Sequence, residues 1–229
     1  MTALPVGTQR TVRTASRGQE SMLVVDHHPV VREGFRHIAG KLGIGRVLEA
    51  ADIVAGYDVF YSQRPRLVVT DLYFEEDGLS GLTLIRRIRT ANPAARILVF
   101  SMHDDPILVA HALRVGAGGF VVKHASITIL LEALAEVRAG RGYLPHEIAT
   151  LVAMLDLRDQ PAPLASLTAR ELQILSLVGQ GKSYPEIAKK IPIKYRRLIS
   201  EISNVRAKVG AKNIFDLIQF AQSHKSLGL

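Results

Sequence analysis

The sequence of 229 residues contains no cysteine, which excludes disulfide bonds and thiol chemistry and fits a reducing compartment. It also lacks any apolar run approaching the roughly 18 residues that a membrane-spanning helix needs. Its first 20 residues are basic and polar, without the apolar core of a secretory signal. We therefore expect a cytoplasmic protein that has no membrane partner and that begins with a disordered tail over residues 1–20.

Acidic residues are scarce in the last part of the chain. Residues 164–229 hold 11 Lys and Arg against 4 Asp and Glu, whereas the whole chain holds 29 against 21. A basic segment of this kind favours a polyanionic partner, most often nucleic acid. A basic surface that meets only solvent would have the same composition, so charge alone leaves both interpretations open.

Between residues 21 and 140, short apolar runs alternate with amphipathic patterns of helical period. The runs predict strands over residues 22–25, 46–50, 67–70, 96–100 and 119–122. The patterns between and after them predict helices over residues 30–42, 51–63, 82–91, 106–115 and 127–139. Five such strand–helix units predict a doubly wound parallel sheet of five strands.

Polar side chains stand at the ends of four of these predicted strands. They are Asp26, Asp71, Ser101 and Lys123. In an open parallel sheet the carboxyl ends of the strands meet at one edge, where ligands bind. A single Asp at a strand end is more often a turn residue, but four polar groups at one edge predict a functional site.

The motifs around these four residues resemble those of a bacterial response-regulator receiver domain, which is flavodoxin-like in fold. They are Val25-Asp26-His27-His28-Pro29, Thr70-Asp71-Leu72, Ser101 and Gly118-Gly119-Phe120-Val121-Val122-Lys123. The resemblance covers about residues 21–140.

The resemblance implies that Asp71 accepts a phosphoryl group from a sensor histidine kinase. Ser101 would hydrogen-bond that group, Lys123 would pair with it, and Phe120 would swing inward as Ser101 moves. Mg²⁺ would be held by Asp26, Asp71 and the backbone carbonyl of Tyr73, since Mg²⁺ prefers hard oxygen ligands. These oxygens and Lys123 would neutralise charge during phosphoryl transfer to the carboxylate.

Two features depart from the family pattern. His27 stands where the family usually has a second carboxylate, and an imidazole suits Zn²⁺ or Cu²⁺ better than Mg²⁺. The loop after Asp71 is about two residues longer, with Glu75 and Glu76, either of which can replace the missing ligand or simply face solvent. Three hypotheses stay open: phosphorylation with weakened Mg²⁺ affinity, a degenerate receiver that is controlled without phosphorylation, and a transition-metal sensor that uses His27, His28 and Asp71.

Residues 141–163 are predicted as a linker that contains a helix over 146–157 and ends in a polar stretch with Pro161 and Pro163. After it, residues 164–229 predict four short helices. Thr168 with Glu171 and Ser183 with Glu186 form two capping boxes, which mark the starts of the first two. Two of the helices joined by a tight turn make a helix-turn-helix unit.

This second domain resembles the LuxR-type DNA-binding domain of NarL/FixJ response regulators. The matching stretches are Leu167-Thr168-Ala169-Arg170-Glu171, Gly181-Lys182-Ser183, Glu186-Ile187-Ala188 and Val209-Gly210-Ala211. The resemblance implies that the helix at 194–209 enters the major groove of duplex DNA. It also implies a homodimer, commonly formed through the last helix.

The predicted recognition helix has its own set of candidate DNA contacts. They are Lys182, Lys194, Arg196, Arg197, Ser200, Glu201, Asn204 and Lys208. Ile199 and Glu201 stand where the family usually has cationic or polar contacts. Glu201 can accept from a cytosine amino group, but it weakens electrostatic attraction to phosphates. Lys182, Lys189, Lys190 and Lys212 can offset this loss by positioning the domain on the DNA backbone.

The sequence therefore predicts a phosphorylation-controlled transcription regulator that binds DNA and is not an enzyme. The alternative is a regulator that acts without phosphorylation, or a partner subunit that acts through protein–protein contacts and does not bind duplex DNA.

Overall fold

The structure is a computed structural model, and it describes residues 20–156 and 163–224 of the protein. The predicted disordered tail lies outside the described residues except for Glu20. So do the polar stretch at 157–162 and the last five residues. Within the described part of the chain, no helix is both long and apolar enough to cross a membrane.

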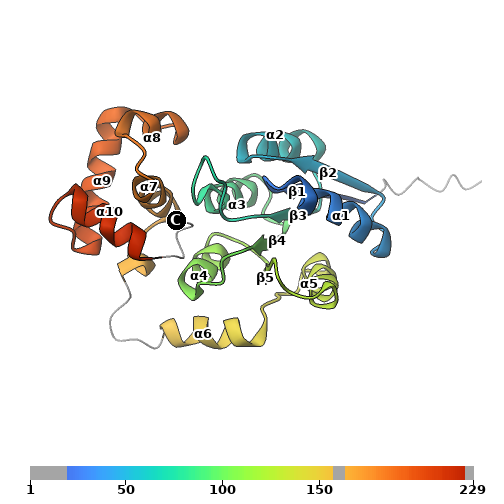
Figure 1. Ribbon diagram of the computed structural model, residues 1–229. Helices are drawn as coiled ribbons and strands as arrows, with labels where there is room; N and C mark the ends of the chain where they lie inside the picture. Colours follow the sequence, from blue (N-terminus) through green and yellow to red (C-terminus); the bar gives the residue numbers. More distant parts are fainter. Residues whose placement is uncertain (1–19, 157–162, 225–229) are drawn as a thin grey trace, which may run out of the picture.

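The first domain is built on one parallel sheet, as predicted (Figure 1). Its strands are β1 (Ser21–Val25), β2 (Arg46–Ala50), β3 (Leu67–Thr70), β4 (Arg96–Ser101) and β5 (Gly119–Val122). They lie in the order β2-β1-β3-β4-β5, and every neighbouring pair is parallel. This is the flavodoxin-like order, in which the point where strand order reverses lies between β1 and β3.

Helices cover both faces of the sheet. They are α1 (Pro29–Lys41), α2 (Ile53–Gln63), α3 (Ser80–Ala91), α4 (Pro106–Arg114) and α5 (Ile127–Ala139). Side chains of α1 and α5 pack with one face, and those of α2, α3 and α4 pack with the other. Strand residues are apolar in near-continuous runs because both faces of the sheet are buried.

The second domain is entirely helical. The connecting helix α6 (His146–Asp156) packs against α4, and a 3₁₀ turn η1 (Pro163–Ser166) follows. The domain then consists of α7 (Ala169–Gly179), α8 (Tyr184–Lys190), α9 (Tyr195–Val209) and α10 (Ile214–Ser223). The capping box of Thr168 and Glu171 forms as predicted.

The element boundaries differ from the prediction by one or two residues. Helix α3 begins at Ser80 rather than at residue 82. Strand β4 continues through Ser101, whose backbone carbonyl accepts from the N–H of Lys123 at 2.8 Å. Ser101 is therefore held in the sheet rather than just beyond it.

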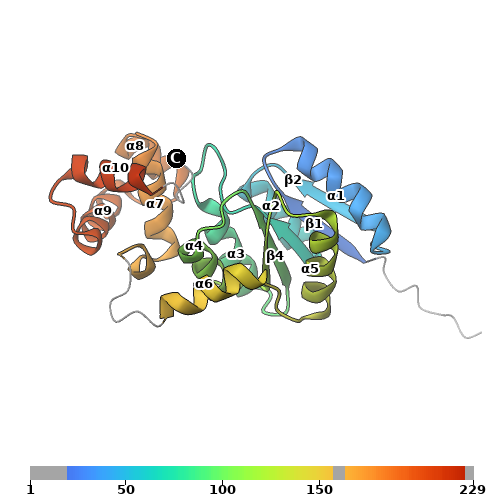
Figure 2. The same ribbon diagram turned by 60° about the horizontal axis from the view of Figure 1, so that its bottom comes forward.

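The two domains pack against each other through α7, which lies beside α3, while α9 lies on the outer side (Figures 1 and 2). The apolar core on the α3 face of the sheet continues into the helical domain. Gly78 meets α7 so closely that a Cβ there would lie 2.9 Å from Ser176 Oγ, and its φ of +60° also favours glycine. The loop before α3 is therefore part of the domain interface.

Candidate functional site

Two buried carboxylates and one lysine meet at the carboxyl edge of the sheet. Asp26 and Asp71 follow β1 and β3 and are only 2% and 3% exposed. Lys123, which follows β5, places Nζ 2.7 Å from Asp26 Oδ2 and 2.6 Å from Asp71 Oδ2. The opposite charges offset part of the cost of burying two carboxylates. The prediction that these three strand ends converge is confirmed by this geometry.

The backbone orients both carboxylates. Asp71 Oδ1 accepts from the N–H of Leu72 at 2.7 Å and from the N–H of Tyr73 at 3.4 Å. Asp26 Oδ1 accepts from the N–H of His28 at 2.8 Å. Each carboxylate is thus fixed by one oxygen and directs the other towards Lys123.

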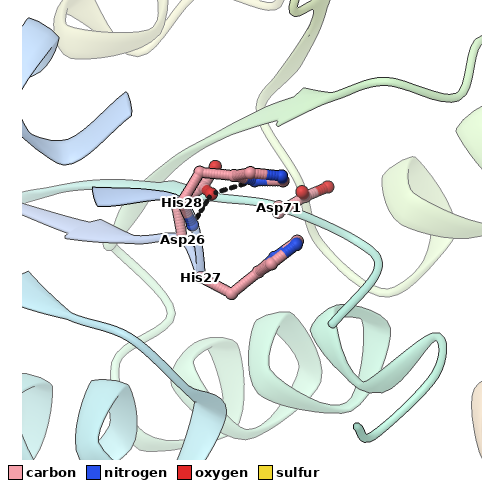
Figure 3. A group of neighbouring side chains, drawn as sticks. All are labelled: Asp26, His27, His28 and Asp71. Atoms are coloured by element: carbon pink, nitrogen blue, oxygen red, sulfur yellow. Dashed lines mark hydrogen bonds and ion pairs between the residues drawn. The ribbon is translucent and has the colours of Figure 1, made fainter. Parts of the chain in front are cut away.

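The two histidines lie side by side at this edge (Figure 3). The Nδ1 of His28 lies 3.1 Å from Asp26 Oδ1, so His28 positions Asp26 at the start of α1. His27 Nδ1 is buried and has no hydrogen-bond partner among the described residues. Burial, followed by the nearby His28, lowers the pKa of His27, so its imidazole is neutral at pH 7.

A cavity of about 400 Å³ opens over Asp71. Its lining residues are His27, His28, Asp71, Tyr73, Glu75, Met102 and His103. The sequence did not single out Met102 and His103, although both directly follow Ser101 at a strand end. Ser101 and Phe120 are fully buried in β4 and β5, and Ser101 Oγ accepts from the N–H of His103 at 3.4 Å.

The donor set can be compared with the needs of Mg²⁺. Asp26 and Asp71 supply carboxylate oxygens, which fit that ion, and ligand atoms of Asp26, His27, His28 and Asp71 all lie within 4.8 Å of one another. His27 adds a neutral nitrogen in place of an anionic oxygen. The residues therefore fit Mg²⁺, with one carboxylate fewer than the family pattern described above, and the neutral His27 does not repel the ion.

The acidic loop between β3 and α3, residues 73–78, reaches the helical domain. Glu76 lies 3.1 Å from Lys190 Nζ and 3.8 Å from Lys182 Nζ, and Asp77 lies 3.5 Å from Lys190 Nζ. Glu76 therefore faces lysines of the second domain and does not replace the missing ligand. Glu75, by contrast, lines the cavity over Asp71.

A second contact joins this loop to α7. Gln180, at the end of α7, donates from Nε2 to the phenolic oxygen of Tyr73 at 2.7 Å and to the carbonyl of Glu75 at 3.3 Å. Tyr73 is two residues from Asp71 and lines the same cavity. One short segment thus contacts both the buried carboxylates and the helical domain.

Most of the predicted DNA contacts lie on an open face of α9. Lys194, Arg196, Arg197, Ser200 and Asn204 are exposed. Tyr195 and Ile199, four residues apart and so on one side of the helix, are 49% and 46% exposed. The buried side of α9 is formed by Leu198, Ile202 and Val205, in agreement with the predicted spacing.

Three of the predicted DNA contacts, Lys208, Glu201 and Arg197, have partners inside the domain. Lys208 Nζ lies 2.7 Å and 2.9 Å from the carboxylate oxygens of Glu171, so it joins α9 to the start of α7. Glu201 is partly buried and lies 3.6 Å from Arg197, which it can orient. The Lys208 contact depends on how α9 packs against α7, so spacing along α9 could not reveal it, whereas Arg197 and Glu201 are four residues apart on the same helix.

Comparisons with known proteins agree with this architecture. The family model of the response regulator receiver domain matches residues 22–135, and that of the bacterial regulatory proteins of the luxR family matches residues 165–221. The chain is 33% identical over 197 residues to the methanol utilization control regulatory protein MoxX of Paracoccus denitrificans, covering 86% of this chain and 88% of MoxX.

Two further similarities cover nearly the full chain. The oxygen regulatory protein NreC of Staphylococcus aureus is 30% identical, over 90% of this chain and 98% of NreC. The structure of RcsB from Salmonella enterica serovar Typhimurium, bound to promoter P1flhDC in the presence of phosphomimetic BeF₃⁻, is 25% identical with a TM-score of 0.57. It covers 90% of this chain and 98% of that one.

The parallel sheet of the first domain and the all-helical second domain thus agree with relatives matched over nearly their full length. The chain belongs to the NarL/FixJ-type response regulators of two-component systems, transcription regulators that join a receiver domain to a LuxR-type DNA-binding domain.

Proposed function

We propose that the protein is a phosphorylation-controlled regulator in which Asp71 is the phosphoacceptor and α9 reads duplex DNA. The observation that carries this proposal is the Asp71 carboxylate, held by backbone N–H groups at the cavity floor with Lys123 Nζ 2.6 Å away. The proposed units are a receiver domain over 21–140, a linker over 141–163 and a DNA-binding domain over 164–229.

In the proposed reaction, an oxygen of Asp71 forms a bond to phosphorus while the bond from phosphorus to the donor breaks. On the sensor kinase that donor atom is a histidine nitrogen, which keeps the electron pair. Lys123 moves from the free carboxylate to an oxygen of the transferred group, and the Ser101 hydroxyl donates to another. Asp26, Asp71 and the Tyr73 carbonyl would hold Mg²⁺, which would supply further charge neutralisation when bound.

The loop between β3 and α3 is the proposed link to DNA binding. In the unphosphorylated form, Glu76 forms ion pairs with Lys182 and Lys190, and Asp77 forms one with Lys190. Without these partners the two lysines would attract DNA phosphates. Phosphorylation changes the charge beside Tyr73 and so biases the loop contacts with α7. The equilibrium then shifts towards a form with a free DNA-binding domain that pairs as a homodimer.

The test compares duplex binding by the whole protein before and after treatment with acetyl phosphate and Mg²⁺. Fluorescence anisotropy with a duplex selected from a random pool gives the affinity at one stated salt concentration. Tighter binding after phosphorylation supports the proposal. Equal binding in both forms favours a receiver that works without phosphorylation, and no binding in either form favours a partner subunit.

The histidine in the metal site gives a first prediction. Because His27→Asp supplies the missing carboxylate, we expect Mg²⁺ to bind about tenfold more tightly, as measured by isothermal titration calorimetry. His37→Asp, on the exposed side of α1, is the matched control and leaves the affinity unchanged. An unaltered Mg²⁺ affinity in His27→Asp would show that position 27 does not face the ion.

The acidic loop gives a second prediction. We expect the Glu76→Ala, Asp77→Ala double variant to bind duplex DNA several-fold more tightly without phosphorylation, because Lys182 and Lys190 lose their partners. A Glu132→Ala, Glu147→Ala protein has the same change in net charge at exposed sites far from α8 and serves as control. If both double variants gained the same affinity for DNA, net charge alone would explain the gain, and the proposed contact would be contradicted.

The exposed apolar side of α9 gives a third prediction. Apolar side chains in the major groove contact thymine methyl groups, and Ile199 is flanked by Arg196 and Ser200. Replacing one thymine of the selected duplex by deoxyuridine, which lacks the methyl group, should weaken wild-type binding by about fourfold. The same replacement should have no effect on Ile199→Ala. Equal sensitivity of both proteins at every thymine would exclude this contact.

A further inference from the structure

A second cavity lies away from the phosphoacceptor site, at the opposite edge of the sheet. Its volume is about 310 Å³, which falls at the lower end of small-molecule sites. Its lining residues are Arg89, Ala95, Arg96, Leu113, Ala117, Gly118, Val137, Gly140, Arg141 and Gly142. Arg96 begins β4 and Ser101 ends it, so the two sites lie roughly 16 Å apart along that strand.

The cavity carries more positive charge than its surroundings neutralise. Arg141 is paired with Glu136, but no carboxylate within residues 20–156 and 163–224 forms an ion pair with Arg89 or Arg96. Among the residues that the structure describes, Arg89 donates only to the carbonyls of Gly116 and Pro93. The side chain of Arg96 makes no hydrogen bond in the part of the chain that the structure describes.

The two uncompensated guanidinium groups are close enough to affect each other. Burial, followed by the charge of Arg96, lowers the pKa of Arg89. Like charges held together at a partly buried site are unfavourable unless an anion offsets them. The unused donors of Arg96 are thus available for such an anion, and a guanidinium can hold a phosphate through two parallel hydrogen bonds.

Glycines let these guanidinium groups lie flush with the backbone. A Cβ at Gly140 would lie 2.6 Å from Arg96 Nη2, and a Cβ at Gly116 would lie 2.9 Å from Arg89 Nε. Both glycines have a positive φ, a backbone conformation that residues with a side chain rarely adopt. The guanidinium groups of Arg96 and Arg89 therefore lie directly against the main chain at Gly140 and Gly116.

We propose that this cavity binds a small phosphate-bearing anion, with Arg96 as the principal ligand and Arg89 and Arg141 beside it. Pyrophosphate, and the diphosphate group of a nucleotide, offer several oxygens to three guanidinium groups and suit it better than orthophosphate. The anion would hold the first residue of β4 to the turn that follows α5. This site is independent of phosphorylation at Asp71.

The test is titration calorimetry of the full chain with pyrophosphate, orthophosphate and ATP, at constant ionic strength set with sodium chloride. We expect pyrophosphate to bind the wild type and Arg96→Gln to lose at least about tenfold in affinity. Arg96→Lys, which keeps the charge but loses the planar fork, should give an intermediate loss and guards against a folding defect in Arg96→Gln.

Two controls separate this cavity from the other charged surfaces. Arg87 lies on α3, the helix that also carries Arg89, and its guanidinium stacks on Tyr57. The Arg87→Gln variant removes this cation and should retain full affinity for pyrophosphate. Asp71→Asn should also retain it, which excludes binding at the phosphoacceptor site. A loss in Arg87→Gln equal to that in Arg96→Gln, or full binding by both Arg96 variants, would overturn the proposal. Stronger binding of ATP than of pyrophosphate would identify a nucleotide as the ligand.

Discussion

Asp71→Asn is expected to abolish phosphoryl incorporation completely. The wild type, incubated with acetyl phosphate and Mg²⁺, should gain one phosphoryl group in its intact mass, and the variant none. The reason is chemical: an amide at this position has no anionic oxygen to attack phosphorus. The change is nearly isosteric in a buried position that is 3% exposed, so the fold should persist.

Asp77→Asn is the matched control for this experiment. It removes one carboxylate from the same loop region, but that group faces Lys190 rather than the cavity. Incorporation should be unchanged in this variant. An adduct on Asp71→Asn would place the acceptor elsewhere, and the absence of any adduct on the wild type would favour the degenerate receiver.

Glu171→Ala is expected to give the largest loss of stability among single substitutions in the helical domain. Glu171 is 4% exposed, accepts from the N–H of Thr168 at 2.7 Å, and holds Lys208 of α9 through two contacts. The substitution removes a cap of α7 and leaves Lys208 without its partner. We expect a loss of about 2–3 kcal/mol in the free energy of unfolding, measured by urea denaturation with circular dichroism.

The second capping box supplies the control. Glu186 accepts from Ser183 in the same pattern at the start of α8, but it is exposed and, among the described residues, forms no ion pair with another helix. Glu186→Ala should therefore cost much less than Glu171→Ala. If the two variants lost the same free energy of unfolding, the cap would contribute to stability and the contact of Glu171 with α9 would not.

The contacts of Glu171 also predict a pH dependence. Burial alone would raise its pKa, but hydrogen bonds from Lys208 and Thr168 outweigh burial, and the pKa is lowered from its ordinary value. A lowered pKa in the folded state stabilises the fold above the ordinary Glu pKa of about 4.3. This stability is lost as the pH falls below that value. In Glu171→Gln the loss between neutral and acid pH should be correspondingly smaller.

The sequence by itself determined the sheet, most helices and the convergence of Asp26, Asp71 and Lys123. These follow from local patterns: apolar runs buried on both faces, caps such as Thr168, and the rule that parallel strands end at one edge. Since such signals are read within short stretches of chain, the prediction needed no knowledge of packing.

Only the tertiary structure decided which partners the charged residues choose. Glu76 meets Lys190 across the domain interface, Lys208 meets Glu171 within the helical domain, and Arg96 meets no carboxylate in the described residues. The first two outcomes depend on how the helical domain packs against the loop before α3 and on how α7 packs against α9, and the third depends on which residues surround the start of β4. Long charged side chains reach several neighbours, so their roles emerge only when those neighbours are in place.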